Sequence, residues 1–204
     1  CSVDWQTNMV RFPRELVEWA IEVTPGRFTM CGRDPKDDFV LGDGQVSFTS
    51  FGTGLQMYEL ETGEIRDTNK KDLEDFARFC DAIPEINAFT TAVAAQDVPG
   101  PLKDFHEAEA IFKSTTKHAI LDAENGHNAR VIIEMGEAIA GGKEALRERP
   151  FFTLCMCPNS PLEIHDGASQ VIIETAKAGL PISILSMGLA GGTTPATLSG
   201  TCVV

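Results

Sequence analysis

The sequence has few basic residues and no apolar run that approaches the roughly 18 residues of a membrane helix. Lysine and arginine number 17 against 30 aspartates and glutamates, which gives a net charge of −13. Such a chain is repelled by a phosphate backbone and by an anionic membrane surface, so we expect neither nucleic acid nor membrane as a partner. We also expect no signal peptide, and the sequence contains no low-complexity segment. We therefore expect a globular protein of the cytoplasm.

Zinc-like cysteine and histidine spacing is missing as well. Six cysteines are spread over 204 residues, a distribution that fits free thiols in a reducing compartment. Cys155 and Cys157 lie two residues apart and share one face of a predicted strand, but zinc needs three or four ligands and none of the four histidines has the matching spacing. We predict buried apolar thiols at these two positions, no disulfides and no metal site.

The first third of the chain has a β-type pattern. A short helix is predicted over 13–23, between Pro13 and the Pro25-Gly26 stop. Residues 28–66 then alternate with period two and are punctuated by turns, which predicts antiparallel hairpins from segments at 28–31, 39–41, 45–50 and 57–65. The pattern changes afterwards. We place a domain boundary near residue 68, with an N-terminal helix and hairpin region over 1–68 and a second domain over 69–204.

From residue 69 onward helical and strand patterns alternate. Apolar runs predict strands at 86–94, 118–121, 151–156 and 181–187, and 3.6-residue periodicity predicts helices at 69–83, 102–114, 129–140 and 164–178. Strands that are apolar on both faces and alternate with helices indicate a parallel sheet covered by helices. The fold class is therefore α/β.

The number of βα units leaves two architectures open. An eight-stranded barrel needs about 250 residues, so four units fit either half of a barrel or most of a small open sheet. The chain starts at Cys1 without a methionine and stops in an apolar run at Val204. We interpret it as a fragment and predict a partial (β/α)8 TIM barrel that holds about the first four βα units.

A glycine-rich segment at 187–200 is the strongest local motif. It follows the last predicted strand, Pro195 suits a first helical turn, and Thr193 or Thr194 can cap that helix. A tight strand-to-helix turn with a cap explains the same residues without a ligand. The segment is neither a phosphate loop nor a dinucleotide fingerprint.

Polar residues also follow three other strands, where α/β folds build their sites. Asn159, Ser160 and Glu163 follow the third strand, although Ser160 and Glu163 also form a possible capping box. Asp122 and Glu124 follow the second strand, where a carboxylate pair could bind a cation or act in acid/base chemistry, or be simply solvated. Gln96 and Asp97 hold the equivalent place after the first strand.

Aromatic residues gather in the β-type region. Phe48, Phe51 and Tyr58 could supply a cation–π wall, but we predict that they pack in a core.

One run, from Gly191 to Thr201, is the most specific of several characteristic stretches. Together with Ser160-Pro161-Leu162 and Gly179 to Ile182, it resembles the trimethylamine methyltransferase family of corrinoid-dependent enzymes. Shorter similar pieces are Gly32 to Pro35, Leu41 to Gly44, Asp97 to Pro99, Thr116 to His118 and Leu146 to Pro150. The resemblance covers nearly the whole chain.

The resemblance implies a TIM barrel about twice this length, of which this chain would be the N-terminal part. It further implies demethylation of trimethylamine or of a quaternary amine such as glycine betaine, with transfer of the methyl group to the reduced cobalt of a separate corrinoid protein, in one-carbon metabolism or methanogenesis. No cofactor is expected to bind this chain directly. A pyrrolysine, which serves the reaction in the trimethylamine enzymes, would lie beyond Val204.

Such a substrate has no proton to give to a base, so the site must orient a cation and present one methyl group to Co(I). The residues we expect to position the small methylated amine are Asp122, Glu124, Asn159, Glu163 and Thr194; no catalytic residue is assigned. A TIM-barrel lyase or aldolase and a non-catalytic module for small cations remain alternatives. Half a barrel has two unpaired edge strands, so we expect the chain to be inactive alone and to form a homo-oligomer.

Overall fold

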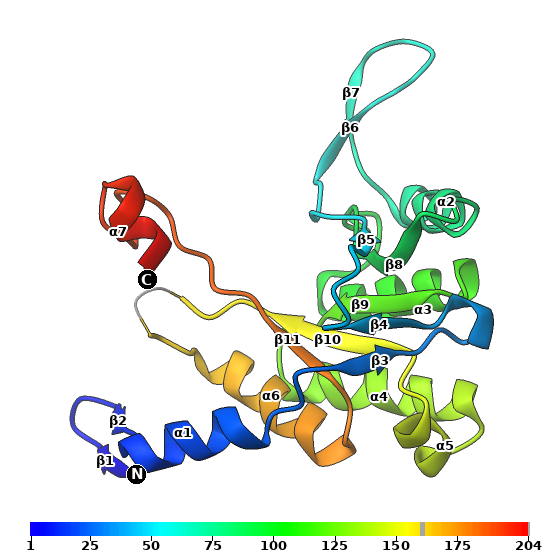
Figure 1. The fold of residues 1–204 in the computed structure, drawn as a ribbon. Coiled ribbons are helices and arrows are strands. Elements are labelled where there is room, and N and C mark those ends of the chain that lie inside the picture. The colour runs from blue at the N-terminus through cyan, green and yellow to red at the C-terminus, as the bar shows by residue number, and fades with distance from the viewer. Residues whose placement is uncertain (160–161, 204) are drawn as a thin grey trace. The chain divides into compact units, whose positions relative to one another are not determined.

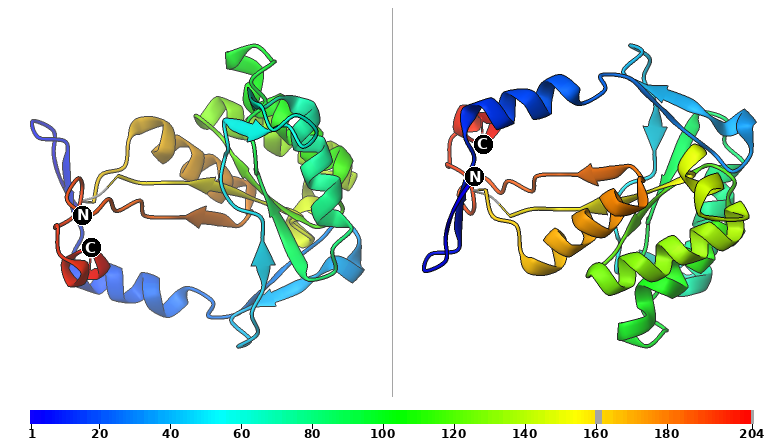
Figure 2. Two further views of the ribbon diagram at one scale, coloured as in Figure 1. Left: turned by 90° about the horizontal axis from the view of Figure 1, so that it is seen from above. Right: turned by 90° about the horizontal axis from the view of Figure 1, so that it is seen from below.

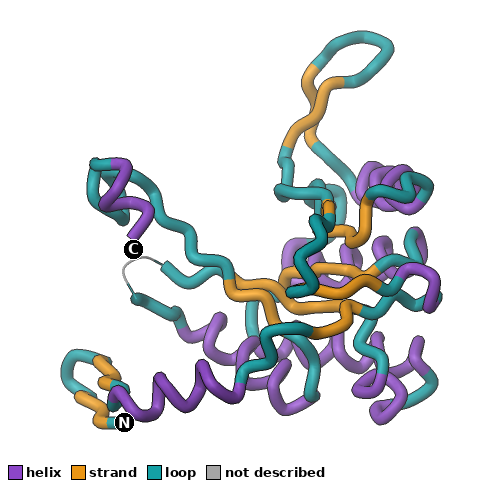
Figure 3. Tube along the Cα trace, viewed as in Figure 1, coloured by secondary structure: helices purple, strands orange, loops and turns teal. Residues whose placement is uncertain are grey.

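The computed structural model describes residues 1–159 and 162–203, and the chain forms two compact units. Unit 1 comprises Cys1–Thr29 and Val40–Gln45, and unit 2 comprises Met30–Phe39 and Val46–Val204. Figure 3 shows where helices, strands and loops alternate along the chain. Within the described residues, no helix is both long enough and apolar enough to cross a bilayer. The domain boundary near residue 68, which would separate residues 1–68 from residues 69–204, stays a prediction.

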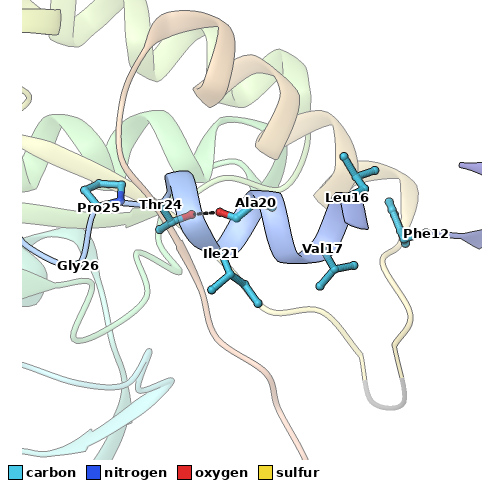
Figure 4. Close-up of a pocket in the computed structure, with 8 residues that line it drawn as sticks. All are labelled: Phe12, Leu16, Val17, Ala20, Ile21, Thr24, Pro25 and Gly26. Carbon is cyan, nitrogen blue, oxygen red and sulfur yellow. Dashed lines mark hydrogen bonds between the residues drawn. The ribbon is translucent and has the colours of Figure 1, made fainter. Parts of the chain in front are cut away.

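Unit 1 contains little packed structure. Strands β1 (Ser2–Asp4) and β2 (Met9–Arg11) pair antiparallel, and the predicted helix is present as α1 (Arg14–Val23). None of the side chains of α1 is buried. The apolar face of α1 lines an open groove of about 510 Å³, which Figure 4 shows in close-up. At the C-terminal end of α1, the Thr24 hydroxyl donates to the Ala20 carbonyl at 2.6 Å.

The body of unit 2 is a five-stranded parallel sheet. Its strands are β5 (Phe48–Thr49), β8 (Ile86–Thr90), β9 (His118–Asp122), β10 (Phe152–Met156) and β11 (Ile182–Ile184). Neighbours follow in the order β11-β10-β9-β8-β5, and every adjacent pair is parallel. The sheet is curled (Figure 2). The strands follow one another across the sheet in the order of the chain, whereas the strand order of a doubly wound sheet reverses at one point. The curled sheet is therefore compatible with part of a barrel.

The sheet has five strands where the sequence predicted four. The additional strand is β5, which was predicted to belong to an antiparallel hairpin but pairs parallel with β8. Side chains secure this pairing, because the Phe48 N–H donates to Asn87 Oδ1 at 2.9 Å and the Ser50 hydroxyl donates to the Thr90 carbonyl at 2.7 Å. The prediction was wrong because period-two alternation reports a strand but not the direction of its neighbour.

Two further strand pairs come from the predicted hairpin region. Strands β3 (Phe28–Met30) and β4 (Phe39–Leu41) pair with each other, and β6 (Gln56–Tyr58) pairs antiparallel with β7 (Ile65–Asp67). The β6–β7 hairpin follows the C-terminal end of β5 and projects from the rest of unit 2 (Figure 1). The predicted packing of Phe48, Phe51 and Tyr58 in a core was wrong, because all three side chains are exposed.

The predicted helices after residue 68 are present, with bounds that differ by a few residues. They are α2 (Lys70–Asp81), α3 (Lys103–Ser114), α4 (Gly126–Ala140) and α6 (Asp166–Ala178). The helix predicted after the glycine-rich segment is present as α7 (Leu198–Val203), and the structure adds α5 (Lys143–Glu148) and short 3-10 turns at Pro35–Asp37 and Gly100–Leu102. A capping box starts α2, because Asn69 Oδ1 accepts from the Asp72 N–H and Asp72 Oδ2 accepts from the Asn69 N–H.

The core lies between the sheet and these helices. Phe89, Leu121, Phe152 and Leu154 point from β8, β9 and β10 into one apolar cluster, where they meet Ala77, Ile111, Ile132 and Val171 from four helices. Phe112, Phe151 and Phe152 pack edge to face, with ring centroids 5.4 Å apart. Because alternate strand residues face this cluster, the remaining strand residues must face the inner side of the curled sheet.

Gly136 allows α4 to approach the sheet closely. A Cβ atom at this position would lie 2.4 Å from Phe152 Cε1, and Phe152 is held in the three-ring cluster. We expect Gly136→Ala to lower the free energy of unfolding by about 1–2 kcal/mol, because overpacking exceeds the gain in helix propensity. Urea unfolding followed by circular dichroism measures the change. Gly100→Ala, where the added Cβ meets no atom within 4 Å, should be neutral; equal midpoints for the two variants would contradict this packing.

The segment from Met30 to Asp38 closes the N-terminal end of the sheet. The Arg33 N–H donates to the Thr116 carbonyl at 2.7 Å, and His118 Nδ1 lies 2.9 Å from the Cys31 carbonyl oxygen. His118 Nε2 lies 2.8 Å from Thr153 Oγ1 on the neighbouring strand, and the ring is completely buried. The N-terminal edge is therefore filled by packed polar contacts, and the opposite edge carries the loops.

Candidate functional site

Three inward-facing residues form a row where β9, β10 and β11 end. Asp122 is the last residue of β9 and is in register with Cys155 on β10, which is in register with Ser183 on β11. Directly paired residues of adjacent strands share a face, and Leu121 and Leu154 occupy the opposite, helix-covered face. The row Asp122–Cys155–Ser183 therefore lies on the inner face, at the C-terminal edge of the sheet.

The thiol of Cys155 stays protonated in this row. Burial raises its pKa to about 11, and the nearby Asp122 carboxylate and the Cys157 thiol act in the same direction, against an opposing contribution from the Ser183 hydroxyl. Cys155 is half-buried and Cys157 is exposed, so the prediction that both are buried apolar thiols was wrong. The residue after a strand end is no longer covered by the neighbouring strands, and for that reason Cys157 faces solvent.

A second carboxyl group lies buried behind the row. Glu107 on α3 is only 5% exposed, and its Oε1 accepts a hydrogen bond from the Ala95 N–H at 2.9 Å, in the loop after β8. Burial raises the pKa of Glu107, and the carboxylates of Asp104 and Asp122 raise it further. The Asp122 side chain is exposed at the rim of the sheet; partial enclosure by the surrounding protein and the nearby Asp104 carboxylate raise its pKa, with partial compensation from Lys103. Part of each upward shift comes from repulsion between the carboxylates at this edge of the sheet, and a cation bound there would relieve that repulsion.

Asp104 holds the loop that carries Asp122 and Glu124. Its Oδ2 accepts from the Glu124 N–H at 2.8 Å and from Asn128 Nδ2 at 2.8 Å. Glu124 therefore lies next to the site through its backbone, whereas its side chain is exposed. Asn125 Oδ1 accepts from the His127 and Asn128 N–H groups and so caps α4.

Asn159 and Glu163 are brought together in the loop after β10. Each donates its backbone N–H to the other's carbonyl, at 2.8 and 2.9 Å, and both side chains are exposed. Asn159 also forms a parallel bridge with Met187, so the loops after β10 and β11 lie side by side. Ser160, the predicted cap between them, lies outside the described residues.

Thr194 is buried inside the glycine-rich segment. Its hydroxyl contacts the Thr201 hydroxyl at 3.2 Å, and its N–H donates to the Leu189 carbonyl at 3.1 Å. The helix that follows begins at Leu198, and Thr197 Oγ1 accepts from the Gly200 N–H at 3.2 Å. The predicted capping role of Thr193 or Thr194 was therefore wrong, since Thr197 is nearer to the helix start.

The comparisons with known proteins agree with the resemblance noted in the sequence. Residues 1–204 match the family described as trimethylamine methyltransferase (MTTB). The chain belongs to this family. It is 44% identical over 201 residues to trimethylamine methyltransferase MttB of Desulfitobacterium hafniense, an alignment that covers 98% of this chain and 40% of that protein. The family match explains why the resemblance extended over nearly the whole chain.

More distant relatives show the same pattern of coverage. The chain is 38% identical over 208 residues to MttB of Methanosarcina barkeri, covering all of this chain and 42% of that protein. It is 28% identical over 193 residues to the glycine betaine methyltransferase of Desulfitobacterium hafniense, covering 94% of this chain and 40% of that protein. The chain therefore spans about two fifths of the length of these members of the trimethylamine methyltransferase family.

Sequence reasoning missed Asp104 and Glu107 as part of this family member's site. Both lie on α3 and both are buried, although charged residues of a helix usually face water. A signal was available, because Glu107 shares its helical face with Ile111, four residues later, within an apolar stripe. Among the described residues, no group of three His, Cys, Asp or Glu side chains is arranged to hold a metal ion.

Replacing Glu107 tests how strongly the site is desolvated. The pKa of Glu107 is raised in the folded protein, so ionisation costs stability as the pH rises from the ordinary glutamate pKa through the raised value. A glutamine side chain at this position would stay neutral and would still accept from the Ala95 N–H. We expect Glu107→Gln to raise the melting temperature by about 2–4 °C at pH 8, and to have almost no effect at pH 4. Calorimetry at both pH values measures this, and destabilisation at pH 8 would contradict it.

Proposed function

We propose that the protein transfers a methyl group from trimethylamine or a quaternary amine such as glycine betaine to the Co(I) of a corrinoid protein. The names of its relatives support the reaction class, since two of them are trimethylamine methyltransferases and one is a glycine betaine methyltransferase. The structural observation that carries the proposal is the inward-facing row Asp122–Cys155–Ser183, backed by the buried Glu107. The row combines a carboxylate with neutral side chains, as recognition of a small methylated cation requires.

The five parallel strands would be the first part of a (β/α)8 barrel. Their sequential order and the curl of the sheet support this architecture, and the family members have additional length that could supply the remaining strands. In a closed barrel the inner face becomes the packed interior, and its C-terminal edge becomes the floor of the active site. Asp122 and Cys155 would then lie at that floor.

The reaction requires little acid/base chemistry from these residues. The carbon–nitrogen bond breaks with its electron pair left on nitrogen, Co(I) supplies the pair for the new cobalt–carbon bond, and cobalt leaves as methyl-Co(III). A quaternary or protonated amine departs as a neutral amine. Asp122 would orient the cationic nitrogen, and the neutral thiol of Cys155 would contact the methyl groups without competing as a nucleophile.

The other predicted substrate residues would act at the rim. Glu124, Asn159 and Glu163 expose their side chains on loops that follow β9 and β10, where they would line the approach of the amine or of the corrinoid. Thr194 would hold the shape of the glycine-rich segment through its contact with Thr201. The corrinoid itself is the acceptor substrate, carried by a partner protein.

Mixing the full-length protein with cob(I)alamin and each amine tests the proposal. Trimethylamine or glycine betaine should convert the Co(I) absorption spectrum into that of methylcob(III)alamin, with release of dimethylamine or dimethylglycine. Absence of transfer from both amines would refute the proposed reaction. Calorimetric binding of an amine without transfer would instead identify a cation-binding module.

A further inference from the structure

The β6–β7 hairpin is a projecting arm with an exposed apolar face. Tyr58 and Ile65 are direct partners in the antiparallel register and therefore share one face. Tyr58 is 67% exposed, Ile65 is 59% exposed, and Leu60 at the turn is 95% exposed. An exposed tyrosine beside two large aliphatic residues is typical of the centre of a protein interface.

The arm is firmly anchored on its other face. Arg66 donates to both carboxylate oxygens of Asp72 at 2.6 and 2.8 Å, and to Glu59 at 2.7 Å. Asp72 belongs to the capping box of α2, so this bidentate ion pair ties the hairpin to a rigid element. At the turn, the Glu59 N–H donates to the Glu64 carbonyl at 2.8 Å. A preorganised arm loses little entropy when it binds a partner.

The base of the arm is joined to the loop that borders the candidate site. The Thr68 hydroxyl lies within hydrogen-bonding distance of the carbonyl oxygens of Leu55 and Ala94, at 3.2 and 2.8 Å. The Gly54 N–H donates to the Ala92 carbonyl, and the Ala94 N–H donates to the Gly54 carbonyl, each at 2.9 Å. The next residue in this loop, Ala95, is the one whose N–H binds Glu107.

The position and charge of the arm indicate which kind of partner it binds. The arm follows the C-terminal end of β5, and the C-terminal ends of parallel strands lie at one edge, where the candidate site also lies. In the described part of the chain, neither Glu61 nor Glu64 at the turn forms an ion pair. A second copy of this chain, with a net charge of −13, would be repelled by this acidic turn.

We infer that the β6–β7 hairpin is the docking arm for the protein that carries the methyl acceptor, through Tyr58, Leu60 and Ile65. That protein is expected to present an apolar patch edged by lysine and arginine, which would face Glu61 and Glu64. The identity of the partner rests on the proposed function; the docking surface does not.

Binding and catalysis are measured separately to test this inference. Three proteins are each titrated with the corrinoid protein of the same organism in sedimentation velocity runs. They are the full-length protein, its Tyr58→Ala/Leu60→Ser variant and an Ile173→Ser control, which changes an exposed apolar residue of α6. Methyl transfer to free cob(I)alamin is assayed in parallel. The hairpin variant should bind the corrinoid protein at least about 10-fold more weakly, and should keep the wild-type rate with free cob(I)alamin. The control should match the wild type in both assays.

Each other outcome has a definite meaning. Equal affinity of the hairpin variant and the wild type for the corrinoid protein, or no binding by the wild type, overturns the inference. Hairpin-dependent binding without methyl transfer to either acceptor supports the docking arm and refutes the proposed function. Loss of self-association in the variant, with unchanged corrinoid-protein affinity, would make the arm a contact between copies. If the hairpin variant does not fold, Glu61→Lys/Glu64→Lys replaces it and should slow association several-fold.

Discussion

Asp122→Asn should lower kcat/KM for the methylated amine at least about 100-fold in the full-length protein, because it removes the inward-facing carboxylate that would orient the cation. Asparagine has nearly the same shape, so the change tests charge and not packing. The pH dependence gives a second readout. Partial enclosure by the protein and the Asp104 carboxylate raise the pKa of Asp122, whose side chain is exposed at the rim, and a bound cation favours the ionised form, so KM for the wild type should fall as the pH rises through that raised pKa. KM for the variant should not depend on pH in this range.

Steady-state kinetics with cob(I)alamin over a range of pH values measure both effects. Glu134→Gln is the matched control, because it removes an exposed carboxylate from α4, the helix that follows the same strand. A kcat/KM for Asp122→Asn within about threefold of the wild-type value would remove Asp122 from the substrate site, and would leave the family assignment intact.

His118→Ala should lower the free energy of unfolding by about 3 kcal/mol at neutral pH. The substitution leaves a cavity at a fully buried position, and it removes the contacts with the Cys31 carbonyl and with Thr153. The same residue makes the wild type sensitive to acid. Burial lowers the pKa of His118 to about 4, so the unfolded chain takes up the proton first and stability is lost as the pH falls from about 6.5 to about 4.

Urea unfolding between pH 7 and pH 4 measures both parts of this prediction. The acid-sensitive contribution of about 3 kcal/mol that His118 makes in the wild type should be missing from His118→Ala, so that the two proteins converge as the pH falls. His127→Ala, which changes an exposed histidine, should retain the wild-type pH dependence. A constant stability difference between His118→Ala and the wild type at all pH values would show that His118 is not neutral in the folded protein.

The two predictions concern opposite ends of one strand. His118 begins β9 and is enclosed by the segment around Cys31, whereas Asp122 ends the same strand and faces the loops. Barrel-type folds separate stability from chemistry in this way, with packed contacts at the N-terminal end of the strands and variable loops at the C-terminal end. His118→Ala should therefore act mainly on stability and Asp122→Asn mainly on turnover.

The alternation of helices and strands after residue 68 was predictable because each element carries its own signal. Strands β9 and β10 are rich in apolar residues, and Asn69 and Gly179 mark the start of α2 and the end of α6. A strand was predicted at 45–50, but its parallel pairing was not, because β5 is two residues long and its partner β8 is nearly 40 residues away. Asp122 was a candidate from its position at a strand end, whereas Glu107 was hidden in a helix.

The sequence by itself determined the α/β class, the order of the βα units from residue 86 onward and the resemblance to the trimethylamine methyltransferase family, because these depend on local periodicity and on short motifs. Only the tertiary structure decided that β5 joins the parallel sheet, that Asp122, Cys155 and Ser183 form one row, and that the β6–β7 hairpin projects with Tyr58 and Leu60 exposed. The physical reason is that strand register and burial depend on contacts between residues far apart in the chain, which no local pattern records.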